Sequence, residues 1–118
     1  VIDDDNDFRT ILCATLEDAG HAVNEACDGL AGIRSFRDSP ADIVLTDMIM
    51  PEREGIETIL ELKRDFPDVK IIAMSGGGRL ETNSFLSFAG KFGACGTLEK
   101  PFSAAHLLSA IDKVLADS

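Results

Sequence analysis

The chain has 118 residues, of which 45% are hydrophobic and 27% charged, and this length and composition suit one globular domain with a single core. Its net charge of −10 at pH 7 disfavours nucleic acid or an anionic membrane as a direct partner of this domain. No apolar run approaches the ~20 residues of a membrane span, and no signal peptide is visible. The three cysteines form no CxxC pair, which predicts free, buried thiols in a reducing cytoplasm.

The chain opens with two apolar residues, Val1 and Ile2, and then places four aspartates and one asparagine at positions 3–7. An apolar start without methionine predicts a fragment of a longer protein, in which the first strand begins upstream. Like charges about 4 Å apart repel by roughly 4 kcal/mol at an effective dielectric constant near 20. The aspartates therefore either spread into water or surround a cation.

Strand and helix patterns alternate along the rest of the chain. Continuous apolar runs at 43–45 and 71–74 predict strands covered on both faces, and the more polar segments 22–26 and 96–99 predict edge strands. Helical periodicity appears at Phe8, Ile11, Leu12, Leu16 and Ala19, at Leu30, Ile33 and Phe36, at Ile56, Ile59, Leu60 and Phe66, and at Leu107, Leu108, Ile111, Val114 and Leu115.

Helix boundaries have their own signals. Gly20 ends the first helix, and Pro40 and Pro67 follow the ends of the second and third. Ser103 is the expected N-cap of the last helix. Weaker periodicity predicts a further helix over 80–92. Five strand–helix units of this kind predict an α/β fold, in which a parallel sheet is sandwiched between helices.

In such sheets, ligands bind beyond the carboxyl ends of the strands. Asp3 and Asp4 follow the first predicted strand, and Asp47 follows the third. Ser75 follows the fourth strand and Lys100 the fifth. Four of the five strand ends therefore carry a group suited to metal or phosphate chemistry.

The segments VIDDD, DIVLTDMIMPEREG, IIAMSGGG and GTLEKPF, in this order, resemble the receiver domain of bacterial two-component response regulators. The resemblance covers essentially the whole chain; each segment alone is weak evidence, but the four together are specific. It implies a single receiver domain, a doubly wound (βα)5 fold with a five-stranded parallel sheet of strand order 2-1-3-4-5 and helices on both faces. It also implies a phosphoacceptor switch that catalyses only its own phosphorylation and dephosphorylation.

The resemblance implies a magnesium site, for which Mn²⁺ can substitute. Asp3 and Asp4 match the acidic pair that holds the metal, and Asp47 and the backbone carbonyl of Ile49 match further ligands. Mg²⁺ prefers octahedral oxygen ligands and keeps several waters, which suits such a half-cage.

The resemblance also implies the phosphoryl chemistry. Asp47 matches the phosphoacceptor, Ser75 matches a hydroxyl that hydrogen-bonds the phosphoryl group, and Lys100 matches the lysine that pairs with it. The Lys100–Pro101 peptide matches a position that is usually cis. An aspartate attacking a phosphoryl group meets charge repulsion, which Mg²⁺ and Lys100 would offset.

Other polar residues have simpler interpretations. We expect Asp5 and Asp7 to face solvent or to sit in the first turn of the first helix, where the helix dipole favours acids. Glu54 is expected to be an acid at a helix N-terminus, and His21 and His106 to be structural or surface residues. The glycine run Gly76–Gly78 lacks the GK[ST] of a P-loop. We expect either a loop kept small for an approaching phosphodonor or a loop made of glycine for flexibility.

The implied partners are a sensor histidine kinase or a histidine phosphotransfer protein, together with a C-terminal output domain or a downstream protein. The face formed by the fourth helix, fifth strand and fifth helix would change on phosphorylation, and it is a common dimer interface in this family. Thr97 departs from the family, because many receivers carry Tyr or Phe three residues before the lysine. An extended stretch near 77–83 is a second departure.

Thr97 supports the alternative function, a receiver-like protein-binding module that works without phosphorylation. Two other functions do not fit the sequence. An aspartate-nucleophile phosphohydrolase would need Thr or Val at position 7, where this chain has Asp7, and the chain is too short to include the cap domain of such an enzyme. An EF-hand beginning at Asp3 would place Phe8 where Gly is needed and Ala14 where Glu is needed.

Overall fold

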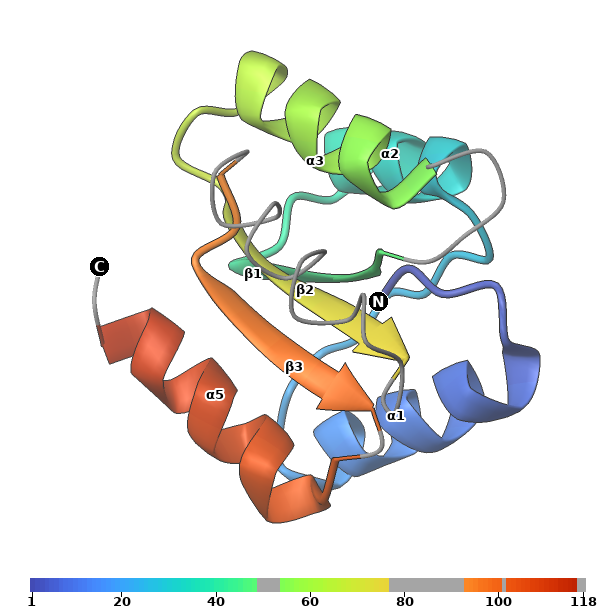
Figure 1. Ribbon diagram of the computed structural model, residues 1–118, viewed down its shortest axis with the longest axis vertical. Helices are drawn as coiled ribbons and strands as arrows, with labels where there is room; N and C mark the ends of the chain where they lie inside the picture. Colours follow the sequence, from blue (N-terminus) through green and yellow to red (C-terminus); the bar gives the residue numbers. More distant parts are fainter. Residues whose placement is uncertain (49–53, 77–92, 101, 117–118) are drawn as a thin grey trace.

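A computed structural model of the chain describes residues 1–48, 54–76, 93–100 and 102–116, and the account below is confined to them. Parallel strands form a central sheet, and helices cover both of its faces (Figure 1). This is the predicted α/β architecture. The predicted helix over 80–92 lies outside the described residues.

The sheet contains β1 (Ile43–Asp47), β2 (Lys70–Gly76) and β3 (Gly96–Lys100), all parallel and in the order β1-β2-β3. Val44 pairs with Ile71 in the register of the first two strands. Because the strands run the same way, their carboxyl ends meet at one edge of the sheet.

The two strands predicted before β1 are each reduced to a single bridging residue. Ile2 forms parallel bridges to Ala26 on one side and to Thr46 of β1 on the other. The Ile2 amide donates to the Leu45 carbonyl at 2.7 Å, and the Ala26 amide donates to the Val1 carbonyl at 2.8 Å. The order across the sheet is still the predicted 2-1-3-4-5.

Two described helices lie on each face of the sheet (Figure 1). One face is covered by α2 (Gly29–Asp38) and α3 (Glu54–Asp65), and the other by α1 (Asn6–Asp18) and α5 (Ala104–Ala116). Each helix turns an apolar stripe toward the strands. The result is the three-layer packing that a parallel sheet requires.

The central strand β2 shows why its sequence is an unbroken apolar run. Ile71 and Ala73 pack into the core on the α2 and α3 side, whereas Ile72 and Met74 pack into the core on the α1 and α5 side. All four side chains are fully buried. Burying a large apolar side chain contributes about 1.5–3 kcal/mol, so β2 anchors both layers.

Side chains at the N-termini of the helices accept hydrogen bonds from backbone amides that have no partner within the helix. The Asp28 carboxylate caps α2 by accepting from the Ala31 amide at 2.8 Å. The Ser103 hydroxyl accepts from the His106 amide at 3.1 Å, which confirms the predicted cap of α5. Gly20 follows α1 with φ +95°, a conformation that glycine adopts without strain.

The predicted apolar faces are wrong at several positions. Leu12 and Leu16 of α1 are buried as predicted, but Ile11 is 68% exposed. Successive helical residues are turned by about 100°, so a residue beside a buried one can face solvent. The other exposed members of the predicted faces are Ala19, Leu30, Leu60 and Leu115.

The backbone of α2 approaches the first strand closely. A Cβ atom at Gly32 would overlap the terminal side-chain carbons of Ile2. Because Ile2 directly precedes the aspartates, this close packing also fixes where the acidic segment begins.

The three cysteines are free thiols, as predicted, but their predicted burial is confirmed only for Cys13. Cys27 and Cys95 are exposed because both lie in segments between elements rather than in a core-facing position. Burial raises the pKa of the Cys13 thiol.

Candidate functional site

Polar side chains from four strand ends meet at the carboxyl edge of the sheet. Asp3 follows the bridging residue Ile2, and Asp47 is the last residue of β1. Ser75 lies one residue before the end of β2, and Lys100 is the last residue of β3. The predicted convergence at this edge is therefore present in the structure.

Three of these carboxylates form a compact cluster. Asp3, Asp4 and Asp47 each contribute one carboxylate oxygen, and the three oxygens lie within 4.8 Å of one another. Asp3 and Asp47 are buried, and Asp4 is exposed. A set of hard oxygen donors open to solvent on one side fits a cation such as Mg²⁺ and is a poor site for a metal that prefers nitrogen or sulfur.

Asp3 is held by both its side chain and its backbone. Its Oδ1 accepts from the Asp5 amide at 2.9 Å, and its Oδ2 accepts from the Lys100 ammonium at 2.6 Å. The Asp3 amide donates to the Ala26 carbonyl at 3.1 Å. Arg9 Nη1 donates to the Asp3 carbonyl at 2.6 Å. These contacts explain how a completely buried carboxylate is tolerated, since a buried charge is costly unless it is paired and hydrogen-bonded.

Lys100 lies between the two buried carboxylates. Its Nζ is 2.6 Å from Asp3 Oδ2 and 3.6 Å from Asp47 Oδ2. On another side, Nζ lies 4.2 Å from the centroid of the Phe8 ring. The side chain is only 18% exposed, so water weakens these interactions less than it would at the surface.

Ser75 brings a hydroxyl to the same edge. The residue is fully buried, and its Oγ has no hydrogen-bond partner among the described residues. An unsatisfied buried hydroxyl costs about 1–3 kcal/mol. Such an atom is unusual in a folded protein and is expected where a ligand oxygen completes the hydrogen bond.

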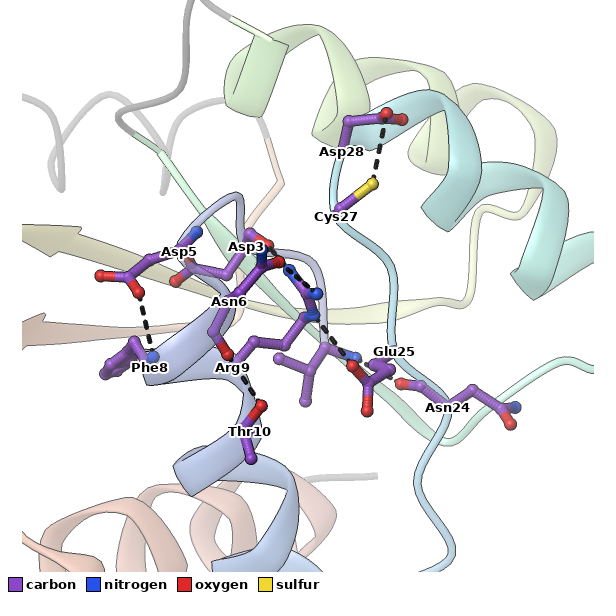
Figure 2. A network of polar contacts seen from close by, with 11 residues as sticks. Asp3, Asp5, Asn6, Phe8, Arg9, Thr10, Asn24, Glu25, Cys27 and Asp28 are labelled. Atoms are coloured by element: carbon purple, nitrogen blue, oxygen red, sulfur yellow. Dashed lines mark hydrogen bonds and ion pairs between the residues drawn. The ribbon is translucent and has the colours of Figure 1, made fainter.

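Asp5 and Asp7 have the structural roles that the sequence predicts. Asp5 is the N-cap of α1, and its carboxylate accepts from the Phe8 amide at 3.1 Å (Figure 2). Asp7 lies in the first turn of the helix, and both side chains are exposed. They complete the opening acidic run without joining the cluster.

Sequence reasoning missed Arg9, which joins three separate segments (Figure 2). Besides its bond to the Asp3 carbonyl, Arg9 Nη2 donates to Asn6 Oδ1 at 2.6 Å and Nε donates to Glu25 Oε1 at 3.0 Å. The hydrogen bond to Glu25 raises the pKa of Arg9. The available signal was a single arginine two residues after the acidic run, in the first turn of the first predicted helix.

Some predicted residues cannot be placed. Ile49, Pro101 and the stretch 77–83 lie outside the described residues, and so do Gly77 and Gly78 of the predicted glycine loop. Glu54 begins α3, as expected of an acid at a helix N-terminus. Thr97 is an exposed residue of β3.

The two histidines lie away from the acidic edge. His21 lines a cavity of about 310 Å³ at the opposite end of the sheet, together with residues that precede the strands, such as Val23 and Asp42. His106 is exposed near the start of α5. Both therefore stay outside the candidate site, as predicted.

Comparison with known proteins gives one consistent picture. A family model described as the response regulator receiver domain matches residues 1–112. The chain is 34% identical to the response regulator receiver protein CpdR of Brucella abortus, over 96% of this chain and 92% of that protein. It is also 34% identical to the DNA-binding transcriptional regulator NtrC of Azospirillum brasilense, over 98% of this chain but only 23% of that protein.

Solved structures agree with the sequence comparison. The receiver domain of NtrX from Brucella abortus superposes with a TM-score of 0.89 and 28% identity, covering 99% of this chain and 97% of the other. The chain thus spans almost all of some relatives and about a quarter of others. Within the part of the chain that the structure describes, no helix is both long and apolar enough to cross a membrane.

Proposed function

The chain belongs to the response regulator receiver domain family, and from this premise we propose that it is the phosphoacceptor switch of a histidine–aspartate phosphorelay. In this proposal a sensor histidine kinase or a histidine phosphotransfer protein supplies the phosphoryl group, and Asp47 accepts it. Asp3, Asp4, Asp47 and the backbone carbonyl of Ile49 would hold Mg²⁺ or Mn²⁺. The family membership supports the switch, and the site geometry supports the assignment of residues.

The single observation that carries the proposal is the surrounding of Asp47 by complementary groups from separate strands. Two further carboxylates lie within reach of one cation, and the Lys100 ammonium is 3.6 Å from Asp47 Oδ2. The Ser75 hydroxyl from the next strand is buried and without a partner among the described residues. A nucleophile, a cation site, a fixed positive charge and a hydrogen-bond donor are what phosphoryl transfer to a carboxylate requires.

The reaction assigns one role to each group. An Asp47 carboxylate oxygen forms a bond to phosphorus while the bond between phosphorus and the donor imidazole nitrogen breaks and leaves its electron pair on that nitrogen. The product is an aspartyl phosphate, and attack of water on phosphorus regenerates Asp47 and inorganic phosphate. Lys100 and Ser75 would then contact the phosphoryl oxygens. A bound Mg²⁺ would offset the negative charge that accumulates on the carboxylates and the transferred group.

The proposed output is a change at the surface next to the site. Ser75 lies in β2 opposite Glu99 of β3, and β3 packs against α5. A shift of Ser75 toward a phosphoryl group would therefore act on β3 and, through β3, on α5. Inverting a 1:99 population requires about 5.5 kcal/mol, which several charge-assisted hydrogen bonds can supply together. The proposed binding partners of this surface are an attached output domain, a downstream protein or a second copy of the chain.

We place this exchange in the cytoplasm. All three thiols are free, including the exposed Cys27 and Cys95, and free exposed thiols persist in a reducing compartment. The net charge of −10 supports protein partners rather than direct contact with nucleic acid or an anionic membrane.

The alternative is a receiver-like binding module that works without phosphorylation, and the exposed Thr97 in place of an aromatic residue favours it. Titration with Mg²⁺, followed by NMR shifts of the amides around Asp47, separates the two. Saturable binding at millimolar Mg²⁺ supports the phosphoacceptor, and no binding supports the module.

Labelling with a small phosphodonor such as phosphoramidate tests the main proposal. The wild-type chain should acquire a Mg²⁺-dependent phosphoryl group that hydroxylamine removes, and Asp47→Asn should abolish it. Asp7→Asn is the matched control, because it removes an exposed aspartate of α1 and should leave labelling intact. Undiminished labelling of Asp47→Asn would rule out Asp47 as the acceptor.

A further inference from the structure

An aromatic ring lies beside the lysine of the site, and a second ring packs against the first. The Phe8 ring centroid is 4.2 Å from Lys100 Nζ, and the Phe8 and Phe102 rings meet edge to face with centroids 5.6 Å apart and an interplanar angle of 87°. The Lys100 ammonium therefore has carboxylate oxygens on one side and a ring face on another.

The position of Phe8 is fixed independently of Lys100. Its amide donates to the N-cap carboxylate of Asp5, which sets the first turn of α1 beside the acidic cluster (Figure 2). Phe102 lies two residues after Lys100 and contacts the Phe8 ring edge to face. The ring is thus held by both segments that supply the site, the start of α1 and the end of β3.

A lysine side chain at a strand end needs neighbouring groups to fix the position of its ammonium. Its ammonium is a compact charge on a long, flexible stem, and three neighbouring carboxylates offer it several competing positions. The electron-rich face of an aromatic ring attracts a cation within about 6 Å of its centroid, and a partly buried site strengthens that attraction. A ring on this side favours the position from which Lys100 reaches both Asp3 and Asp47.

We propose that Phe8 is a positioning residue, which holds the Lys100 ammonium against the acidic cluster so that it is ready to contact the incoming phosphoryl group. The proposal rests on the function proposed above for Asp47 and Lys100. Phe8 touches neither the donor nor Asp47 in this assignment and acts only through Lys100.

Two substitutions distinguish a positioning role of the Phe8 ring from a purely structural role in packing. Phe8 also packs against the core layer of α1 and α5, and a leucine would preserve most of that packing while removing the ring. A tyrosine would preserve both the packing and the ring face, and because Phe8 is partly exposed, its hydroxyl can reach water. Phe8→Leu and Phe8→Tyr therefore separate the two roles.

The first measurement is an NMR spectrum of the lysine ε-methylene groups, with the Lys100 signal assigned from the Lys100→Arg variant. A methylene beside a ring face is shifted upfield, so the Lys100 signal should lie upfield of the other lysine signals in the wild type and in Phe8→Tyr. In Phe8→Leu it should return to the position of the others. A wild-type Lys100 signal without the upfield shift overturns the inference and leaves the function of Asp47 untouched.

The second measurement is the rate of labelling by phosphoramidate at saturating Mg²⁺. We expect Phe8→Leu to be slower by about 3- to 10-fold and Phe8→Tyr to match the wild type. Phe36→Leu is the matched control, because Phe36 forms the same kind of edge-to-face pair with Phe66 on the other face of the sheet. It should lower stability without changing the rate.

The outcomes distinguish the two proposals. Equal rates for the wild type and Phe8→Leu overturn the positioning role alone. Equal slowing of Phe8→Leu and Phe8→Tyr also overturns it, since the ring face is then not the cause. Absence of labelling in the wild type overturns the proposed function, and the positioning role falls with it.

Discussion

The middle of the sheet and its carboxyl edge both contain fully buried side chains, but these side chains have opposite chemistry. In the middle, Ile71 and Met74 are fully buried among other apolar side chains. At the edge, Asp3 and Ser75 are fully buried as well, and burying such polar groups lowers stability unless they are paired. The first region stabilises the fold, and that stability offsets the cost of keeping polar groups buried in the second region.

The largest effect on stability is expected in the apolar core that packs against the middle of the sheet. Leu62→Ala in α3 removes a fully buried side chain and should lower the free energy of unfolding by about 3–5 kcal/mol. Urea unfolding measures this. Labelling per folded molecule should stay at the wild-type value, and a loss of labelling in the folded fraction would contradict the separation of the two regions.

The next effect is expected at the edge. Lys100→Met removes the ammonium that pairs with the buried Asp3 carboxylate, and it should cost about 3 kcal/mol because the charge is left without its partner. Adding Asp3→Asn to this variant should restore much of the loss, since the uncompensated charge is then gone. A double variant as unstable as the sum of the two single variants would show that the pair does not interact.

Magnesium should stabilise the edge without affecting the middle. At a concentration 100 times its Kd, Mg²⁺ should raise the free energy of unfolding by about 2.7 kcal/mol, measured as a shift in the urea midpoint. Asp3→Asn should remove most of this gain, whereas Leu62→Ala should keep it. An equal gain in Asp3→Asn would mean that the metal binds elsewhere.

The smallest effect compares two helix caps of the same kind. Asp28 caps α2 away from the cluster, and Asp5 caps α1 beside it. Asp28→Ala should cost about 1 kcal/mol. Asp5→Ala should cost less, because the loss of the cap is partly offset by weaker repulsion from Asp3 and Asp4. An Asp5→Ala variant that is the less stable of the two would show that repulsion is unimportant at the edge.

Much of the fold and of the site follows from local sequence patterns. The unbroken apolar run of β2 predicted burial on both faces, and parallel strands bring their carboxyl ends together whatever the loops do. This rule alone was enough to predict that Asp3, Asp47, Ser75 and Lys100 lie at one edge of the sheet.

The rest depends on contacts between segments that lie far apart in the sequence. Periodicity could not show that Ile11 and Leu30 face solvent, because the rotation of a helix is set by what packs against it. Nor could it show that Arg9 reaches back to Asp3 and across to Glu25, or that Phe8 meets Lys100. Only the assembled structure brings these residues together.

The ion pair between Lys100 and Asp3 joins residues 97 positions apart, so it closes a loop that includes most of the chain. Contacts of such long sequence separation form late, after shorter loops have closed. A chain still emerging from the ribosome lacks this lysine while its aspartates are already exposed. We therefore expect the Lys100–Asp3 ion pair to form only after the chain has been synthesised past Lys100 and has folded, so that shorter nascent chains lack the paired acidic edge.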